Sequence, residues 1–408
     1  MKEPKIRFKG FSGEWKRSTL GDLALLSKGS GYSKSDICKE GTPVILYGRM
    51  YTKYQSVFDE IDTFVNPKDN SVVSKGGEVI IPGSGESSED ISLAAMVKNE
   101  GVILGGDLNI LKFNQKVNDP AFMSMAITYS PTRAELSSYS QGKTVVHLRN
   151  SEIAKGTIRY PDILEQNTIV NYVLSLDAQI SASTSRLASL KQMKAASLQA
   201  MFPQEGETVP KVRFKGFDGE WKTRSLNNYA KKRTEKNVNR IYNVTLTNSA
   251  EFGIIDQRQF FDHDISNSEN IDGYFVVRDK DFVYNPRISA SAPVGPINQN
   301  KLGYPGVMSP LYLVFEVKGI NHDFLEIYFH TALWHKYMFD NGNSGARFDR
   351  LTISDDDFMR MPIPDISLAE QQSIAFFFTS LDRQIALHTQ RLEKLKQIKA
   401  ACLDKMFA

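Results

Sequence analysis

Two long segments of the chain repeat apolar residues at alternating steps of four and three, the spacing of a heptad seam. The segments span residues 165–202 and 370–407, and neither contains Pro or Gly. Each can therefore form one continuous helix of nearly forty residues, about 55 Å long at about 1.5 Å per residue. We expect the seam between these helices to consist of Leu176, Ile180, Leu187, Leu190, Leu381, Ile385, Leu392 and Leu395.

A long helix with one apolar stripe needs a partner to cover that stripe. The nearest partner is the other helix of the same chain. Because the chain must build a whole domain between the two helices, we expect an antiparallel coiled coil. The alternative is two independent helices, each packed on its own domain.

The segments outside the helices read mainly as strands and turns. The runs "GGEVIIPGSGE" at 76–86 and "DKDFVYNPRIS" at 279–289 are short and apolar, and Gly, Pro, Asn and Ser bound them. The predicted fold class is therefore α+β, with β-rich globular domains joined by the two long helices.

The chain is an internal duplication. The stretch "PKIRFKGFSGEWK" at 4–16 returns as "PKVRFKGFDGEWK" at 210–222, and the two helical segments also match each other. At a displacement of 203 residues, Gly142 aligns with Gly345 and Leu148 with Leu351. The segments between the repeated entry stretch and the helix therefore share a fold in the two halves, although most of their residues differ. The two halves should be related by a pseudo-twofold axis.

This duplication predicts four domain segments. They are a first β-rich domain at 1–160, a first helix at 161–203, a second β-rich domain at 204–363 and a second helix at 364–408. Prolines at 161 and 364 mark the boundary between each domain and the helix that follows it.

Composition narrows the class of protein only slightly. The 408 residues carry a net charge of +3, which permits a DNA partner without demonstrating one. Only two cysteines are present, Cys38 and Cys402, so no disulfide framework is expected. No run of eighteen apolar residues and no signal sequence is evident, and we expect a cytoplasmic protein.

The order of these segments resembles the specificity subunits of type I restriction-modification systems. The resemblance rests on "RFKGFSGEW" and "RFKGFDGEW" before each domain and on "PD…EQ…I…LD…I" opening each helix, and it covers essentially the whole chain. It implies a non-catalytic, DNA-binding subunit with two target recognition domains. Each domain would read one half of a bipartite double-stranded DNA target, and the helices would set the distance between the halves.

The resemblance also implies partners. Two methyltransferase (modification) subunits would dock on the constant regions, which are the segments that both halves share. Restriction subunits would join through the complex. Those partners would use S-adenosylmethionine, ATP and Mg, none of which this chain is expected to bind.

Candidate DNA-binding residues lie in polar loops, because base edges are read mainly by Arg, Lys, Asn and Gln, and Ser and Thr contact phosphates. In the second domain they follow the strand-like "DFVY" or lie in "GNSGARFDRL" at 342–351; the alternatives are an ordinary solvated loop and ion pairs with Asp349 or Asp355. These candidates are Asn285, Arg287, Ser289, Ser291, Arg347 and Arg350.

In the first domain the candidates come from "SQGKTVVHL" and from "LYGRMYTKYQ", where basic and aromatic residues alternate. The second of these stretches also fits an amphipathic strand with its tyrosines on one face. The candidates are Arg49, Tyr51, Lys53, Gln141, Lys143 and Thr144.

No catalytic or metal-binding motif is evident. The chain lacks "(D/N)PP(Y/F)", a Gly-rich methyl-donor motif and "GxxxxGK(S/T)", and its six histidines show no dyad or ligand spacing. Two other functions remain open: a self-contained methyltransferase or nuclease fused to its recognition domain, and a coiled-coil scaffold with no DNA role.

Overall fold

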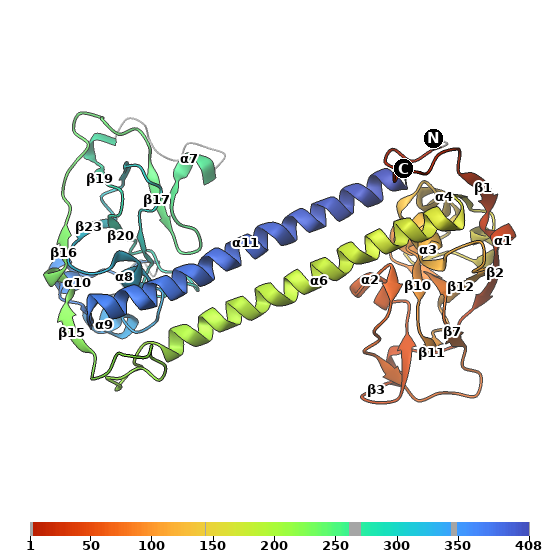
Figure 1. Cartoon of the computed structure of the whole chain (residues 1–408), viewed down its shortest axis with the longest axis horizontal. Coiled ribbons are helices and arrows are strands. Elements are labelled where there is room, and N and C mark those ends of the chain that lie inside the picture. Colours follow the sequence, from red (N-terminus) through yellow and green to blue (C-terminus); the bar gives the residue numbers. More distant parts are fainter. Residues whose placement is uncertain (1–2, 143, 261–270, 344–348, 408) are drawn as a thin grey trace. The chain divides into compact units, whose positions relative to one another are not determined.

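The computed structural model describes residues 3–142, 144–260, 271–343 and 349–407. Two compact units make up the chain. Unit 1 comprises Met1–Thr184 and Gln390–Ala408, and unit 2 comprises Ser185–Thr389. Each unit therefore contains one β-rich domain and one stretch of each long helix (Figure 1).

The domain of unit 1 is built around one five-stranded sheet. Its central strand, β8 (Glu78–Pro82), has all five residues buried, as the apolar run predicts. Helix α3 (Pro120–Tyr129) covers this sheet and begins where the Asp119 carboxylate accepts hydrogen bonds from the amides of Ala121 and Phe122. In spatial order the strands are β2 (Ala24–Lys28), β12 (Leu108–Phe113), β8 (Glu78–Pro82), β10 (Ala95–Val97) and β5 (Val57–Phe58).

A second five-stranded sheet and several short elements complete unit 1. In spatial order the second sheet is β3 (Ile37–Cys38), β6 (Phe64–Val65), β4 (Thr42–Ile45), β11 (Glu100–Leu104) and β7 (Val73–Lys75). The short elements include β1 (Lys16–Thr19), which pairs with β14 (Thr157–Tyr160), and the helices α1 (Leu20–Leu23), α4 (Thr132–Tyr139) and α5 (Asn150–Ile153).

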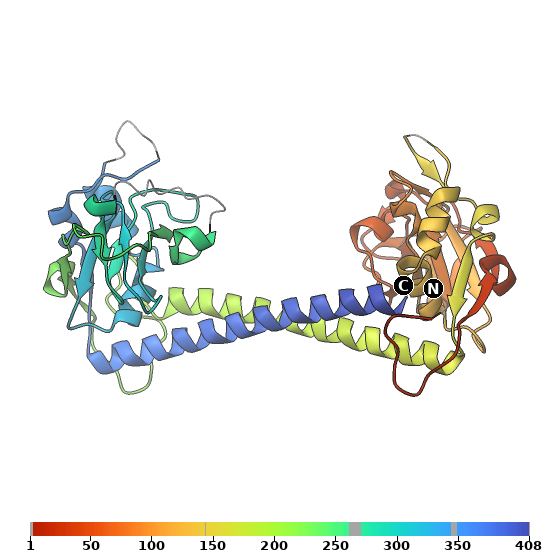
Figure 2. The ribbon, with the colours of Figure 1, turned by 90° about the horizontal axis from the view of Figure 1, so that it is seen from above.

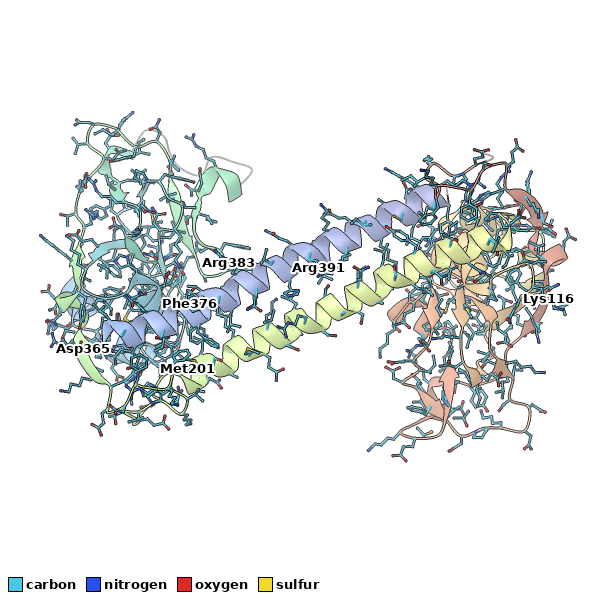
Figure 3. The ribbon with its side chains drawn as sticks, in the orientation of Figure 1. Lys116, Met201, Asp365, Phe376, Arg383 and Arg391 are labelled. Carbon is cyan, nitrogen blue, oxygen red and sulfur yellow. The ribbon has the colours of Figure 1, made fainter. Side chains whose placement is uncertain are left out.

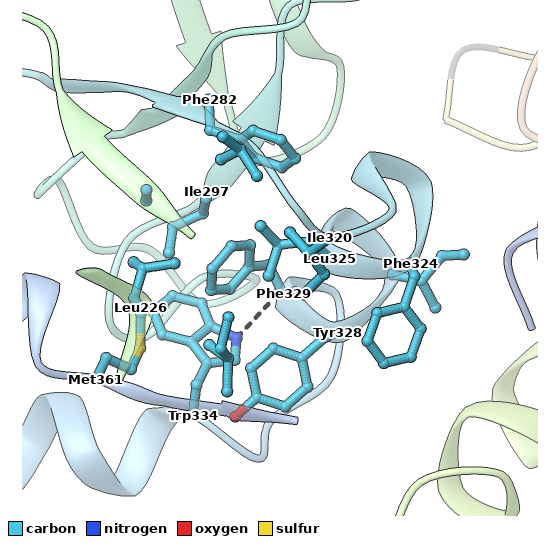
Figure 4. Packing of buried hydrophobic residues seen from close by; sticks show 14 of the residues in the cluster. Leu226, Phe282, Ile297, Ile320, Phe324, Leu325, Tyr328, Phe329, Trp334 and Met361 are labelled. Carbon is cyan, nitrogen blue, oxygen red and sulfur yellow. Dashed lines mark hydrogen bonds between the residues drawn. The ribbon is translucent and has the colours of Figure 1, made fainter. Parts of the chain in front are cut away.

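Unit 2 has a four-stranded sheet covered by helix α8 (His322–Phe329). The Asn321 side chain caps α8, and the Trp334 indole nitrogen donates a hydrogen bond to the Phe329 carbonyl at 3.0 Å inside the aromatic core (Figure 4). The sheet order is β16 (Ala230–Lys232), β23 (Leu313–Val317), β20 (Phe282–Tyr284) and β21 (Ile297–Gln299). The helices are α7 (Gln257–Phe260), α8 (His322–Phe329), α9 (His335–Asn341) and α10 (Asp355–Met359).

Strand order shows that the two domains share one fold. The order β2-β12-β8-β10 in unit 1 corresponds to β16-β23-β20-β21 in unit 2, and the β1–β14 pair corresponds to β15 (Lys222–Ser225) with β24 (Pro362–Asp365). The predicted duplication through the middles is thus confirmed. The domains diverge elsewhere, since unit 2 has two-stranded pairs, β17 (Leu246–Ser249) with β18 (Gly253–Asp256) and β19 (Phe275–Val277) with β22 (Gly306–Met308).

The two long helices are α6 (Ile163–Ala200) and α11 (Leu368–Met406), of 38 and 39 residues. Inside unit 1, Asp177 of α6 pairs with Lys399 of α11; inside unit 2, Lys194 pairs with Asp382 at 2.6 Å. Partner numbers fall along α11 as they rise along α6, so the helices pack antiparallel. All eight expected seam residues are buried or half-buried.

Each long helix ends in the core of the other domain. The end of α11 reaches the domain of unit 1, where Figure 2 marks the C-terminus. Phe407, just after α11, packs on Phe122 of unit 1 at 5.5 Å between ring centroids. Phe202, just after α6, packs on Trp221 and Phe324 of unit 2 at 5.6 and 5.9 Å. The alternative of two independent helices, each packed on its own domain, is therefore wrong.

The repeated "RFKGF.GEWK" holds the start of each helix. Arg7 forms a two-pronged hydrogen-bonded ion pair with Glu165, at 2.8 and 2.7 Å, and Arg213 does the same with Glu370, at 2.7 and 2.9 Å. In each case the third guanidinium nitrogen donates to the carbonyl of a glycine of the repeat. The repeat is thus a structural clamp.

Among the described residues, no helix combines the length and the apolar character needed to cross a membrane.

Candidate nucleic-acid interface

In unit 2, two loops that are distant in sequence lie side by side. The backbones of Arg287 and Arg350 pair as an antiparallel bridge. Hydrogen bonds flank it, from the Ile288 amide to the Asp349 carbonyl and from the Leu351 amide to the Pro286 carbonyl, both at 2.9 Å. The structure thus brings together two of the loops that the sequence singles out.

The two arginines of this bridge are available for a ligand. Arg287 is exposed and Arg350 is half-buried, and neither forms an ion pair with the described residues. Asp355 pairs with Lys232 instead, so the expected alternative of an Arg350–Asp355 ion pair is not observed. The neighbouring candidate Arg347 lies outside the described residues.

The remaining candidates of unit 2 shape the loop. Asn285 donates from its amide to the Asn248 carbonyl at 2.9 Å and accepts from the Arg287 amide at 3.0 Å, so its side chain is already engaged. Ser289 and Ser291 are exposed, with their hydroxyls 3.2 Å apart. Asn285 therefore positions Arg287, while the two serine hydroxyls hydrogen-bond to each other at the exposed loop surface, where Ser289 Oγ also accepts from the Ala292 amide at 3.2 Å.

In unit 1 the corresponding place is a hairpin packed on a short strand. Strand β13 (Val146–His147) pairs with β9 (Ser84–Gly85), and the backbones of Gln141 and His147 exchange hydrogen bonds of 3.0 and 2.8 Å. A Cβ on Gly142, whose φ is +135°, would lie 1.9 Å from the Val145 carbonyl oxygen, so the turn requires glycine. Gln141 and Thr144 are exposed, and Lys143 lies outside the described residues.

The stretch "LYGRMYTKYQ" contributes one residue to this hairpin region. Contrary to the expected strand, it contains a single helical turn, α2 (Arg49–Thr52), because the amides of 49–53 bond to carbonyls three or four residues earlier. The Tyr51 hydroxyl donates to the Ser84 carbonyl at 2.8 Å. Burial, together with the charges of Asp90 and Asp107, raises the pKa of Tyr51, which keeps this donor protonated.

Arg49 of α2 and Lys53, the residue just after this helix, are engaged elsewhere. Lys53 and Arg49 both pair with Asp62 and hold the pKa of that carboxyl below its usual range. Arg49 also lies over the ring of Phe58 at 5.4 Å and donates to the Glu60 carbonyl at 3.0 Å. Arg49 is therefore a structural residue, whereas the exposed Lys53 retains access to solvent.

Two side chains that the sequence analysis passed over occupy the centre of the unit 1 hairpin. Ser84 and His147 are directly paired across β9 and β13, and the Ser84 hydroxyl lies 2.9 Å from His147 Nδ1. The signal was present in the sequence, because the displacement of 203 residues that aligns Leu148 with Leu351 also aligns His147 with Arg350.

A second surface lies along the long helices. On the unit 2 part of α11, Phe376 is 76% exposed and Leu387 is 58% exposed. Figure 3 marks Phe376 with Arg383 on this helix, and Arg391 farther along it in unit 1; neither arginine forms an ion pair with the described residues. Among those residues, no group of three or more His, Cys, Asp or Glu could hold a metal ion.

Two solved structures are similar to this chain. The type I restriction-modification S subunit from M. genitalium aligns over 100% of this chain and 99% of its own, at 13% identity and a TM-score of 0.58. The HsdS subunit from Thermoanaerobacter tengcongensis aligns over 96% of each chain, at 16% identity and a TM-score of 0.47. No curated protein sequence matches the chain.

A family model places the chain independently of those structures. The model of the type I restriction modification DNA specificity domain matches twice, at residues 12–192 and 219–397. These two matches fall on the two copies of the duplication and together span most of the sequence. The chain therefore belongs to the type I restriction-modification DNA specificity family and is, as the sequence analysis expects, a non-catalytic DNA specificity subunit.

Proposed function

We propose that each unit reads one half of a bipartite double-stranded DNA target, through the loops around Arg287 and Arg350 in unit 2 and around Gln141 in unit 1. One observation carries this proposal. The two copies present the same backbone pairing at the same position but with different side chains, Arg287 opposite Arg350 and Ser84 opposite His147. A common framework with divergent outward side chains is what two different half-sites require.

The long helices have a separate role in this proposal, which is to set the distance between the half-sites. Helices of 38 and 39 residues are about 57 Å long at about 1.5 Å per residue. At about 3.4 Å per base pair this corresponds to about 17 base pairs. That length suits two short half-sites separated by a spacer that the protein does not contact.

Partner subunits complete the proposed complex. Two methyltransferase subunits dock on the segments that both halves share, including the exposed faces of α6 and α11. On α11, Phe376 and Leu387 offer apolar contacts. Restriction subunits join through the complex. The partners bind S-adenosylmethionine, ATP and Mg, and the predicted division at 1–160, 161–203, 204–363 and 364–408 separates the recognition domains from the helices.

Mapping of methylated adenines by long-read sequencing tests this function. In cells that express the chain with its methyltransferase partner, the methylated motif should consist of two constant half-sites separated by a spacer of fixed length and free sequence. A single contiguous motif would contradict the proposed division between the units.

Binding in vitro separates this function from a scaffold role. The chain in complex with its methyltransferase partner should bind a duplex that carries both half-sites, and the affinity should fall steeply as salt rises, because phosphate contacts release counterions. Lack of sequence-dependent binding by the assembled complex would favour the scaffold.

A further inference from the structure

We propose that His147, held in place by Ser84, contacts a base edge in the half-site of unit 1, at the position that Arg350 occupies in unit 2. This inference rests on the proposed reading of one half-site by each unit. It assigns a specificity-determining residue to unit 1, where Arg49 and Lys53 are engaged by Asp62.

The backbone makes the two positions equivalent. In unit 1 the Leu148 amide donates to the Gly83 carbonyl at 3.1 Å, and in unit 2 the Leu351 amide donates to the Pro286 carbonyl at 2.9 Å. Both residues of the second pair lie 203 positions after those of the first. The bridges His147–Ser84 and Arg350–Arg287 follow at the same displacement, so the register of the two copies agrees residue by residue.

Burial shows which side chains point outward. Val146 and Leu148, which flank His147, are 7% and 1% exposed, whereas His147 is exposed. Side chains alternate between the two faces of an extended strand, so the apolar neighbours anchor the hairpin and direct His147 away from the core. In unit 2, Leu351 is buried beside Arg350 in the same way.

The imidazole is oriented by a single hydrogen bond. The Ser84 hydroxyl lies 2.9 Å from Nδ1, and Nε2 has no hydrogen-bonding partner among the described residues. The Tyr51 hydroxyl in turn holds the Ser84 backbone through its carbonyl. Ser84 is therefore a positioning residue, and Nε2 is the atom that remains available for a ligand.

Local charge favours a base edge over a phosphate as that ligand. The Tyr51 hydroxyl that bonds to Ser84 experiences the charges of Asp90, Asp107 and Glu86. Negatively charged carboxylates beside the loop repel the phosphates of a DNA backbone. A hydrogen bond from or to imidazole Nε2 suits the groove edge of a base, as donor to guanine O6 or N7 or as acceptor from an adenine or cytosine amino group.

Competition between duplexes tests the proposal. The complex of the full chain with its methyltransferase partner is titrated with the native target and with targets in which one half-site is scrambled. His147→Ala should reduce discrimination at one half-site by about tenfold and leave the other unchanged. Arg350→Ala should affect the opposite half-site, which identifies the half-site of each unit.

Variants of Ser84 distinguish positioning from a purely structural role. Ser84→Ala should lower discrimination at the same half-site as His147→Ala, and Ser84→Thr, which keeps the hydroxyl, should restore it. The double variant Ser84→Arg with His147→Arg transplants the unit 2 pair and should change the preferred sequence of that half-site alone in methylation mapping.

The outcomes separate this inference from the proposed function. Unchanged discrimination with His147→Ala, or equal loss at both half-sites, would overturn the role of His147 while leaving the unit 2 assignment intact. If neither scrambled half-site weakens binding of the wild-type complex, the reading of one half-site by each unit fails instead.

Discussion

At the scale of residues, arginine serves two different roles, depending on whether a buried carboxylate lies beside it. Arg7 and Arg213 are clamped by buried glutamates and carry the framework, whereas Arg287 and Arg350 lie in surface loops without ion pairs to described residues. The hydrogen bond that Arg7 donates to Glu165 raises the pKa of Arg7, so its guanidinium stays charged at any physiological pH.

Removing the Arg7 clamp should destabilise unit 1. Arg7→Ala leaves the Glu165 carboxylate, whose side chain is 3% exposed, buried without its partner, at a cost of about 3 kcal/mol. Urea unfolding together with hydrogen exchange at the start of α6 measures the effect. The control is Lys16→Ala, which breaks an exposed ion pair with Asp162 and should leave stability unchanged. Equal effects of the two variants would refute the clamp.

Truncating the surface arginines should change recognition and leave stability intact. Arg287→Ala and Arg350→Ala are each expected to weaken discrimination at the unit 2 half-site by about 1–3 kcal/mol, the usual worth of a base contact. Duplex competition measures this. Lys116→Ala, an exposed residue of unit 1 (Figure 3), controls for lost charge. Equal weakening at both half-sites would count against the assignment.

At the scale of elements, each long helix is anchored by its end. Met406 and Phe407 are 4% and 3% exposed in the core of unit 1, and Met201 and Phe202 are 5% and 0% exposed in that of unit 2. The core of each domain is thus completed by a helix that follows the other domain in the chain. This exchange explains why both copies keep the closing Met-Phe.

The helix ends should therefore stabilise the domain that they enter. Phe407→Ala should destabilise unit 1, and Phe202→Ala should destabilise unit 2, each by about 3–5 kcal/mol for a buried phenyl ring. Hydrogen exchange followed separately in the two domains measures where protection is lost. Leu387→Ala, on an exposed part of α11, is the matched control. Loss of protection in the opposite domain would show that the exchange is wrongly assigned.

At the scale of the whole molecule, the proposed function depends on helix length. The seam residues are buried or half-buried on both helices, and the proposed function requires the two helices to act as a stiff pair. A stiff pair of defined length restricts the spacing of the half-sites, and a change of one turn, about 5.4 Å, corresponds to one or two base pairs.

Lengthening the helices should lengthen the spacer. Four residues inserted near Ser183, with a matching insertion opposite in α11, should move the preferred spacer by one or two base pairs. A seven-residue insertion in both helices keeps the heptad seam in register and should add about three base pairs, since it adds about 10 Å. Methylation mapping gives the spacer directly. An unchanged spacer with the seven-residue insertion would refute the proposal that helix length sets the distance between the half-sites.

The sequence by itself was sufficient for the duplication, the two long helices and their seam, because repeats and heptads are local patterns that do not depend on distant contacts. It also indicated the loops of Arg287 and Arg350. It predicted a strand where α2 forms, since a single turn is too short to leave a periodic signal.

Only the tertiary structure decided which loops meet and which charged residues are free. The pairing of Ser84 with His147, and of Arg287 with Arg350, joins residues 63 positions apart, a distance that no local pattern encodes. The engagement of Arg49 by Asp62 and Phe58 likewise depends on packing. Long-range contacts therefore determine the recognition surface, while local patterns determine the framework that holds it.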